Sequence, residues 1–191
     1  MAKISTNSQT TVCVEELPAG AEEVPAEEVP SPPAEVSSVA SAEAVIVEAC
    51  NAEKRREFDF WAGRWIVHVP DGRLAGHNVI TIEQGGCALV ERWDSAGGGT
   101  GVSTNYWDPR NDQWVQNWIS SDGTIIQLAG GLDEAGAMVL VGTIIGPDGS
   151  EGKMRGVWTL LEDGRVRQTF EVAKDESDWT LWFEGLYTRE P

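Results

Sequence analysis

The chain has 191 residues, of which 41% are hydrophobic and 24% charged, and its formal net charge at pH 7 is -17. This length suits one domain plus a tail. The acidity argues against nucleic acid, whose phosphates require clustered Lys and Arg, and against anionic membrane surfaces. No stretch reaches the roughly 20 apolar residues of a membrane helix, and the N-terminus has no apolar run of signal-peptide length. We therefore expect a cytoplasmic protein with no nucleic-acid and no membrane partner.

Residues 1–40 are predicted to form a disordered acidic tail. The sequence EEVP occurs there twice, and all nine Trp, all four Phe and both Tyr lie at or after Phe58. A segment rich in Glu and Pro and poor in large apolar groups does not offset the entropy of ordering. The core is expected downstream of Phe58, because aromatic side chains bury the most area. A scaffold protein that acts through this tail stays open as an alternative.

Residues 41–62 are expected to form a helix and a lead-in to the domain. Ser41 can cap the N-terminus, and Lys54, Arg55 and Arg56 near the far end suit the helix dipole. We predict a helix over about 42–56 that packs across one end of the domain that follows.

The remainder, residues 63–191, has the pattern of strands alternating with turns. Four Asp-Gly pairs, which favour tight hairpin turns, begin at positions 71, 122, 148 and 163. The predicted strands lie near 64–69, 73–83, 87–94, 100–107, 113–120, 124–131, 137–146, 152–161, 165–174 and 179–189. A meander of this many strands has to close or stack to hide its edges. The expected fold is all-β, an antiparallel up-and-down meander β-barrel of about eight to ten strands, wide enough for a ligand cavity.

Cysteine and histidine give no sign of a metal or cofactor site. Cys13, Cys50 and Cys87 form no Cys-x-x-Cys or Cys/His spacing, and we predict reduced thiols over a disulfide framework. His68 and His77 flank the first hairpin without a third ligand, so they are expected to be exposed strand residues. We expect no metal and no cofactor; a haem bound through one axial His is a weak alternative.

The start of the first strand carries a motif with a known counterpart. Gly63-Arg64-Trp65, preceded by a short helix, resembles the Gly-x-Trp signature of the calycins, the superfamily of lipocalins and fatty-acid-binding proteins. The resemblance implies that an Arg of the last strand packs over this Trp and closes the barrel end. Arg189 is placed to do so, and guanidinium stacking on indole is physically favourable. Trp65 and Arg189 are therefore the expected barrel seal.

A second resemblance is closer and covers roughly residues 56–190. The blocks are similar to those of an uncharacterised bacterial calycin-like family, domain of unknown function 1579. They are FDFWAGRW (58–65), GGCALVERW (85–93), STNYWDP (103–109), WVQNW (114–118) and FEGLY (183–187). Trp107 departs from the Tyr expected there. The family implies a fold but no settled activity, so it supplies no catalytic residues.

If Trp65 points inward as in calycins, the similar blocks imply an inward-facing set. Its members are Glu91, Trp93, Ser103, Asn105, Trp107, Trp114, Gln116 and Trp118. An aromatic wall with a few hydrogen-bonding groups is typical of a small-molecule pocket. We predict that the protein binds a hydrophobic or aromatic small molecule there, with every member except Glu91 as a ligand-binding residue. A packed core without a cavity is the alternative, and the oligomeric state is open.

Glu91 is the candidate catalytic residue. Burial raises the pKa of an unpaired carboxyl group, which suits proton transfer. Pairing with an inward Arg155, or a position at the wet mouth of the barrel, would leave it structural or ligand-orienting. The enzymatic alternative is a cyclase, isomerase or pericyclic catalyst that works mainly by preorganising its substrate, with Glu91 as acid or base.

Overall fold

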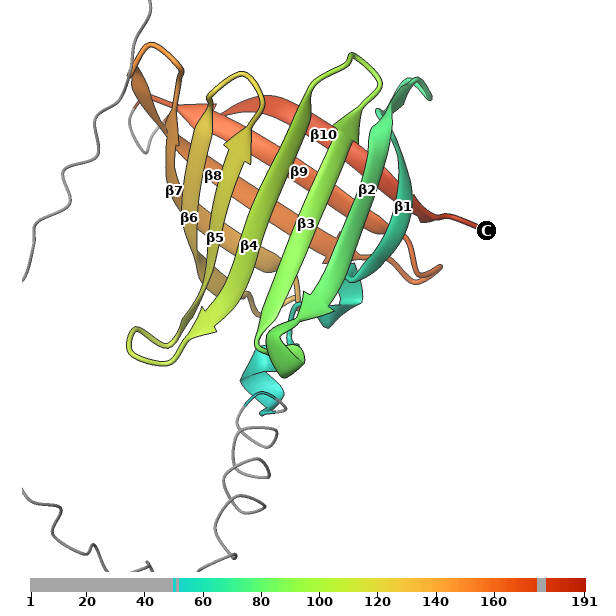
Figure 1. Ribbon diagram of the computed structural model, residues 1–191, viewed down its shortest axis with the longest axis vertical. Helices are drawn as coiled ribbons and strands as arrows, with labels where there is room; N and C mark the ends of the chain where they lie inside the picture. Colours follow the sequence, from blue (N-terminus) through green and yellow to red (C-terminus); the bar gives the residue numbers. More distant parts are fainter. Residues whose placement is uncertain (1–49, 51, 175–177) are drawn as a thin grey trace, which may run out of the picture. The chain divides into compact units, whose positions relative to one another are not determined.

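The computed structural model describes residue 50, residues 52–174 and residues 178–191. Ten antiparallel strands, each paired with the next along the chain, form a closed barrel in which β1 also pairs with β10 (Figure 1). The strands are β1 Gly63–His68, β2 Leu74–Glu83, β3 Ala88–Ser95, β4 Thr100–Asp108, β5 Gln113–Ser120, β6 Ile125–Leu132, β7 Met138–Ile145, β8 Glu151–Leu160, β9 Val166–Ala173 and β10 Thr180–Arg189. The predicted all-β meander barrel is confirmed, and each strand lies within about one residue of its expected bounds.

The Asp-Gly pairs form the turns that the sequence predicts. In the β5–β6 turn Gly123 has a φ of 91°, which suits a residue without a Cβ. The carboxylate of Asp122 accepts a hydrogen bond from the amide of Thr124 at 2.9 Å. Asp71, Asp148 and Asp163 accept the same bond from the residue two positions on. This local chemistry sets where the strands on either side of these four turns end.

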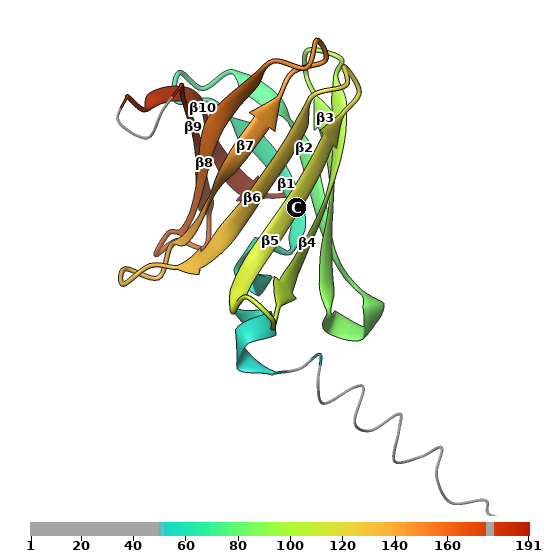
Figure 2. The ribbon, with the colours of Figure 1, turned by 90° about the vertical axis from the view of Figure 1, so that its left-hand side faces the viewer.

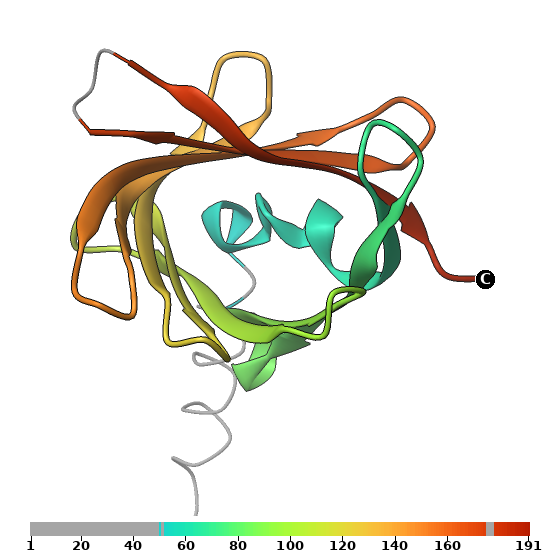
Figure 3. The same ribbon diagram turned by 90° about the horizontal axis from the view of Figure 1, so that it is seen from above.

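The segment before the barrel contains short 3-10 helices within the described residues. They are η1 Glu53–Arg56 and η2 Asp59–Trp61, and a third, η3 Gln84–Gly86, lies between β2 and β3. Most of the predicted helix over 42–56 lies outside the described residues, as does the predicted tail over 1–40. Viewed from above, η1 and η2 lie within the outline of the strands (Figure 3). They occupy the end that is lower in Figures 1 and 2, here called the lower end.

An aromatic plug closes the lower end. Phe58 and Trp61 are fully buried and stack with ring centroids 5.0 Å apart. Phe58 meets Trp114 and Trp158 edge-to-face at 5.6 and 5.3 Å. The large apolar area of these rings makes the lead-in segment part of the barrel core.

A disulfide joins Cys50 to Cys87, and the expectation of reduced thiols is therefore wrong for this pair. The two Cα atoms are 4.8 Å apart although the residues are separated by 37 positions. The fold brings the segment before η1 beside η3, which sequence spacing does not reveal. Arg56 strengthens the same junction, since its guanidinium donates to the Gly86 carbonyl and pairs with Asp59 at 3.1 Å. Cys13 lies outside the described residues.

Trp65 and Arg189 are directly opposite each other where β1 meets β10. The guanidinium carbon of Arg189 lies 4.3 Å from the Trp65 ring centroid, and Arg189 Nη1 donates to the Ala62 carbonyl at 3.1 Å. The buried indole of Trp65 donates to the Trp61 carbonyl at 2.9 Å. The closed antiparallel up-and-down barrel fits a calycin-like fold. Across the part of the chain that is described, no helix has the length and apolar character needed to cross a membrane.

Candidate functional site

The eight residues expected to face inward all occupy inner-face positions of β3, β4 and β5. Along β4 the burial alternates strictly, with the side chains of Ser103, Asn105 and Trp107 buried and those between them exposed. Cross-strand pairing then sets Glu91 beside Ser103, and Asn105 beside Gln116. The alternation of the pleat is therefore enough to collect these side chains inside the barrel.

A cavity of about 120 Å³ lies inside the barrel, towards the end opposite the plug. Six aromatic rings and one aliphatic side chain form most of its wall, and polar groups form the remainder. The lining residues are Glu91, Trp93, Gln116, Trp118, Ile126, Gln168, Phe170, Trp182, Phe183 and Tyr187. The wall is thus apolar with a few convergent polar groups, which is the usual make-up of a small-molecule site.

Inward-facing glycines let the rings lie close to the sheet. A Cβ at Gly101 would overlap the Trp118 indole, and one at Gly76 would lie 2.8 Å from the Trp93 ring. A Cβ at Gly185 would lie 2.8 Å from the Phe183 ring. Such contacts are shorter than carbon atoms tolerate, so each of these rings occupies the space that a neighbouring side chain would need.

Glu91 is the centre of a buried polar network. Its Oε1 accepts from Asn78 Nδ2 at 2.7 Å, and its Oε2 accepts from the Ser103 hydroxyl at 2.7 Å. Asn105 Nδ2 donates to Ser103 Oγ at 2.8 Å, and Gln116 Nε2 donates to Asn105 Oδ1 at 2.9 Å. The chain of bonds runs from β2 to β5 and holds each amide in place.

The network continues to the strands at the far end of the sequence. Asn78 Nδ2 is 3.3 Å from the Tyr187 hydroxyl, which donates to Gln168 Oε1. Asn78 Oδ1 is buried without a hydrogen-bond partner. Burial raises the pKa of Tyr187 well above its usual value, and the nearby Glu91 charge adds to this effect. Tyr187 is therefore a neutral hydroxyl at physiological pH.

Burial raises the pKa of Glu91 from 4.5 to about 7, although the hydrogen bonds from Ser103 and Asn78 lower it. The alternative prediction that Arg155 pairs with Glu91 is wrong. Arg155 faces away from the interior and pairs with Glu171, with 2.6 Å between their side chains. The inward positions of β8 are instead those of Met154 and Trp158, both fully buried. A buried carboxyl group without a cation beside it is costly to ionise.

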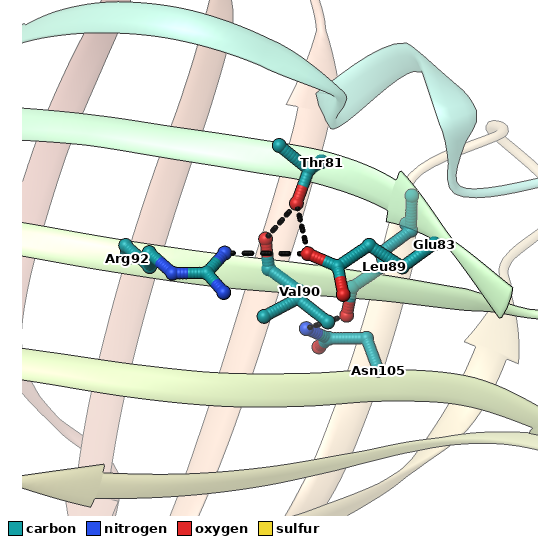
Figure 4. A network of polar contacts seen from close by, with 6 residues as sticks. All are labelled: Thr81, Glu83, Leu89, Val90, Arg92 and Asn105. Carbon is teal, nitrogen blue, oxygen red and sulfur yellow. Dashed lines mark hydrogen bonds and ion pairs between the residues drawn. The ribbon is translucent and has the colours of Figure 1, made fainter.

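Polar contacts flank β3 on both faces (Figure 4). On the inner face Asn105 Nδ2 donates to the Leu89 carbonyl at 3.2 Å, which fixes the amide that holds Ser103. On the outer face the Thr81 hydroxyl donates to Glu83 at 2.7 Å, and Arg92 lies 3.4 Å from the same carboxylate. The outer contacts are partly exposed and tie β2 to β3 without reaching the cavity.

The predicted ligand-binding residues divide into three groups. Trp93, Gln116 and Trp118 line the cavity, and Ser103 and Asn105 support Glu91 from behind. The other two lie towards the plug. They are Trp107 and Trp114. Lys54 Nζ lies 5.4 Å from the centroid of the Trp107 ring, and the Trp114 indole donates a hydrogen bond to the Lys54 carbonyl at 3.1 Å. Neither Trp107 nor Trp114 lines the cavity.

Sequence reasoning missed the lining residues of β9 and β10. Phe183 and Tyr187 are six and two positions before Arg189 along the alternating face, so an inward Arg189 could have identified them. Gln168 and Phe170 then follow from hairpin pairing with β10. Trp182 is about half exposed and also lines the cavity. It lies where the register between β9 and β10 shifts, and the sequence holds no signal for this shift.

Histidine supplies nothing to the cavity. His77 lies on the outside of β2, where its Nδ1 is 3.0 Å from Glu190. Among the described residues, no group of three or more His, Cys, Asp or Glu side chains is arranged to hold a metal ion.

Fold and site together define a closed antiparallel β-barrel with an internal aromatic cavity. No protein-family model matches the chain, and a search of curated proteins returns no significant match. The functional argument therefore rests on the geometry of the cavity.

Proposed function

We propose that the protein binds a small hydrophobic or aromatic molecule in the cavity between β3, β5, β9 and β10. The observation that carries the proposal is a cavity of about 120 Å³ lined by six aromatic rings next to a buried carboxyl group. Apolar protein cavities of about 150 Å³ accept a single benzene ring. A ring-sized group is thus the part of a ligand that fits inside, with any longer part directed past Trp182.

Intrinsic Trp fluorescence tests this proposal directly. Titration with benzyl alcohol should change the emission of Trp93 and Trp118, which line the cavity. Trp118→Ala should abolish binding measured by calorimetry. Trp179→Ala is the matched control, because its ring lies under Arg155, 4.8 Å from the guanidinium, and does not line the cavity. Unchanged affinity in Trp118→Ala would place the site elsewhere.

A second candidate function is acid–base catalysis by Glu91, and its pKa of about 7 favours it. A general acid or base works best when its pKa is close to the working pH. A cyclase, isomerase or pericyclic catalyst would use the cavity to hold a flexible substrate in a reactive conformation. Glu91→Gln should then slow turnover with little loss of substrate binding. Equal loss of both would favour simple binding.

We further propose that the barrel is related to the calycin-like family described as domain of unknown function 1579. Support comes from the positions of its blocks, which supply Trp65, Glu91, Asn105 and Tyr187 to the barrel interior. An experimental structure with the Arg189 guanidinium away from Trp65 would remove this support.

Location in the cytoplasm stays a prediction, and the disulfide argues against it. Disulfides persist in oxidising compartments and are rare in the cytosol. Alkylation of free thiols in protein taken directly from cells would decide this. Labelling of Cys50 and Cys87 would favour the cytoplasm, and protection would favour an oxidising compartment.

A further inference from the structure

We infer that the ligand carries a positive charge: an amine or quaternary ammonium group seated beside Glu91 and enclosed by the aromatic rings of the cavity. The inference rests on the proposed function, because it names the chemical class of the ligand that the same cavity takes.

The charge of the lining is the first argument. Ten residues line the cavity, and they include one carboxyl group and no Lys, Arg or His. An anionic ligand, such as a carboxylate or phosphate, would lose its water next to Glu91 with no counter-charge. Like charges placed together in this way cost several kcal/mol. A cationic ligand would instead be attracted to Glu91, because no Lys, Arg or His of the cavity lining pairs with this carboxylate.

The hydrogen bonding of Glu91 is the second argument. Each carboxylate oxygen has room for about two donors. Asn78 occupies one site on Oε1 and Ser103 one on Oε2. The carboxyl group lines the cavity, so its remaining acceptor sites are available to a donor inside it. The two fixed donors hold the carboxylate in one orientation and leave the pairing position to the ligand.

The aromatic rings are the third argument. A cation is attracted to the face of a Trp, Tyr or Phe ring, and several rings around one site form the usual cage for an ammonium group. The cage here is Trp93, Trp118, Phe170, Trp182 and Phe183. Their centroids are 6.2 to 6.5 Å apart in the three pairs that touch. Four of the five rings are thus linked by direct contacts, and Trp118 lines the same cavity.

The protein's own cations leave this cage free. Within the described chain, the cation–π contacts place Arg189 on Trp65, Lys54 on Trp107 and Arg155 on Trp179. None of these three rings lines the cavity. The cavity rings therefore keep their faces available for an external cation.

A pair of probes of the same shape separates charge from size. Choline and 3,3-dimethylbutan-1-ol differ in that a quaternary nitrogen replaces a quaternary carbon. Titration calorimetry at pH 8 and low salt should give an affinity for choline about tenfold higher or more, because a desolvated cation–π contact and an ion pair both favour it. The anion 3,3-dimethylbutanoate should bind more weakly than either.

The pH dependence supplies a test that needs no variant. The neutral groups facing Glu91 are Asn78 of β2, Ser103 of β4 and Tyr187 of β10, and Tyr187 stays protonated. Glu91 is protonated below about pH 7, so lowering the pH to 5.5 should reduce the preference for choline severalfold. The affinity for the alcohol should change little.

Glu91→Gln should remove the preference for choline and keep the binding of the alcohol. Glu151→Gln, the same change at an exposed position of β8, is the control and should bind like the wild type. Circular dichroism checks that both variants fold, and the probe pair at two pH values tests the inference if Glu91→Gln does not fold.

The outcomes separate the inference from the proposed function. If the alcohol binds at least as tightly as choline at pH 8, the inference is wrong and the cavity remains a neutral-ligand site. If none of the probes binds and benzyl alcohol leaves the Trp fluorescence unchanged, the proposed function fails as well.

Discussion

Glu91 makes the stability of the barrel depend on pH in an unusual direction. Its pKa is about 7 in the folded protein against 4.5 for an ordinary Glu, so the folded state holds a proton that the unfolded state releases. The stabilisation is complete below about pH 4.5 and is lost as the pH rises through 7. A difference of about 2.5 pKa units corresponds to about 3 kcal/mol, of which about 2 kcal/mol is lost between pH 5.5 and 8.

Other carboxyl groups also have shifted pKa values. Asp59 has a raised pKa because of burial, and its effect on stability has the same sign as that of Glu91. In other carboxyl groups, turn and side-chain hydrogen bonds lower the pKa. Each of these groups stabilises the fold at pH values above its pKa in the unfolded chain, and this stabilisation is lost on acidification. These groups are Asp71, Glu83, Asp108, Asp122, Asp148, Asp163 and Glu190.

Urea denaturation of the wild type and Glu91→Gln at pH 5.5, 6.5, 7.5 and 8 measures the effect. The amide should fit the site, because its oxygen can accept from Asn78 Nδ2 and its nitrogen can donate to the Ser103 hydroxyl oxygen. The difference in unfolding free energy between the two proteins should shift by about 2 kcal/mol in favour of the variant as the pH rises. Parallel pH profiles would refute the reasoning.

Three further results are expected. Trp118→Ala should abolish ligand binding, whereas Trp114→Ala should keep it and lose about 3–5 kcal/mol of stability by calorimetry and denaturation, because Trp114 packs on the plug. The reverse pattern would place the site at the lower end. Cys87→Ser should lower stability by about 2–4 kcal/mol, and dithiothreitol should lower the Tm of the wild type alone. Equal melting with and without reductant would contradict a formed disulfide. Arg189→Lys and Trp65→Phe should couple by about 0.5 kcal/mol or more in a double-mutant cycle, and strict additivity would argue against the contact.

Local chemistry made the fold predictable from the sequence. Each Asp-Gly pair sets a turn through its own side chain and a positive φ, so strand ends follow from residues close together in the chain. The inward set was implied by the resemblance to the calycin-like blocks with Trp65 inside, and its members within each strand are spaced by the period of two. The same rule gives Met154 and Trp158 as the inward residues of β8, and applying it there would have excluded Arg155.

Long-range packing accounts for what the sequence did not reveal. Trp114 and Trp118 lie on the same inner face of β5 but at different positions along the barrel axis. For this reason Trp118 lines the cavity, whereas Trp114 packs on the plug. Alternation gives the face of a strand and not the depth. The disulfide depends on a segment crossing the lower end to meet η3, and no spacing rule connects Cys50 with Cys87.

Gly101 makes the shape of the cavity adjustable through a paired exchange with Trp118. Since the Trp118 indole fills the space above Gly101, Gly101→Ala alone forces the ring to move. Combined with Trp118→Phe, the added methyl group would replace part of the volume removed, so the sheet keeps its packing while the pocket changes form. The other two glycines differ, because a Cβ at Gly76 would also overlap the Asp94 carbonyl oxygen, and one at Gly185 would also meet Val67 at 2.8 Å. A change of ligand preference in this barrel can thus be made at the Gly101–Trp118 pair by a compensating exchange between β4 and β5.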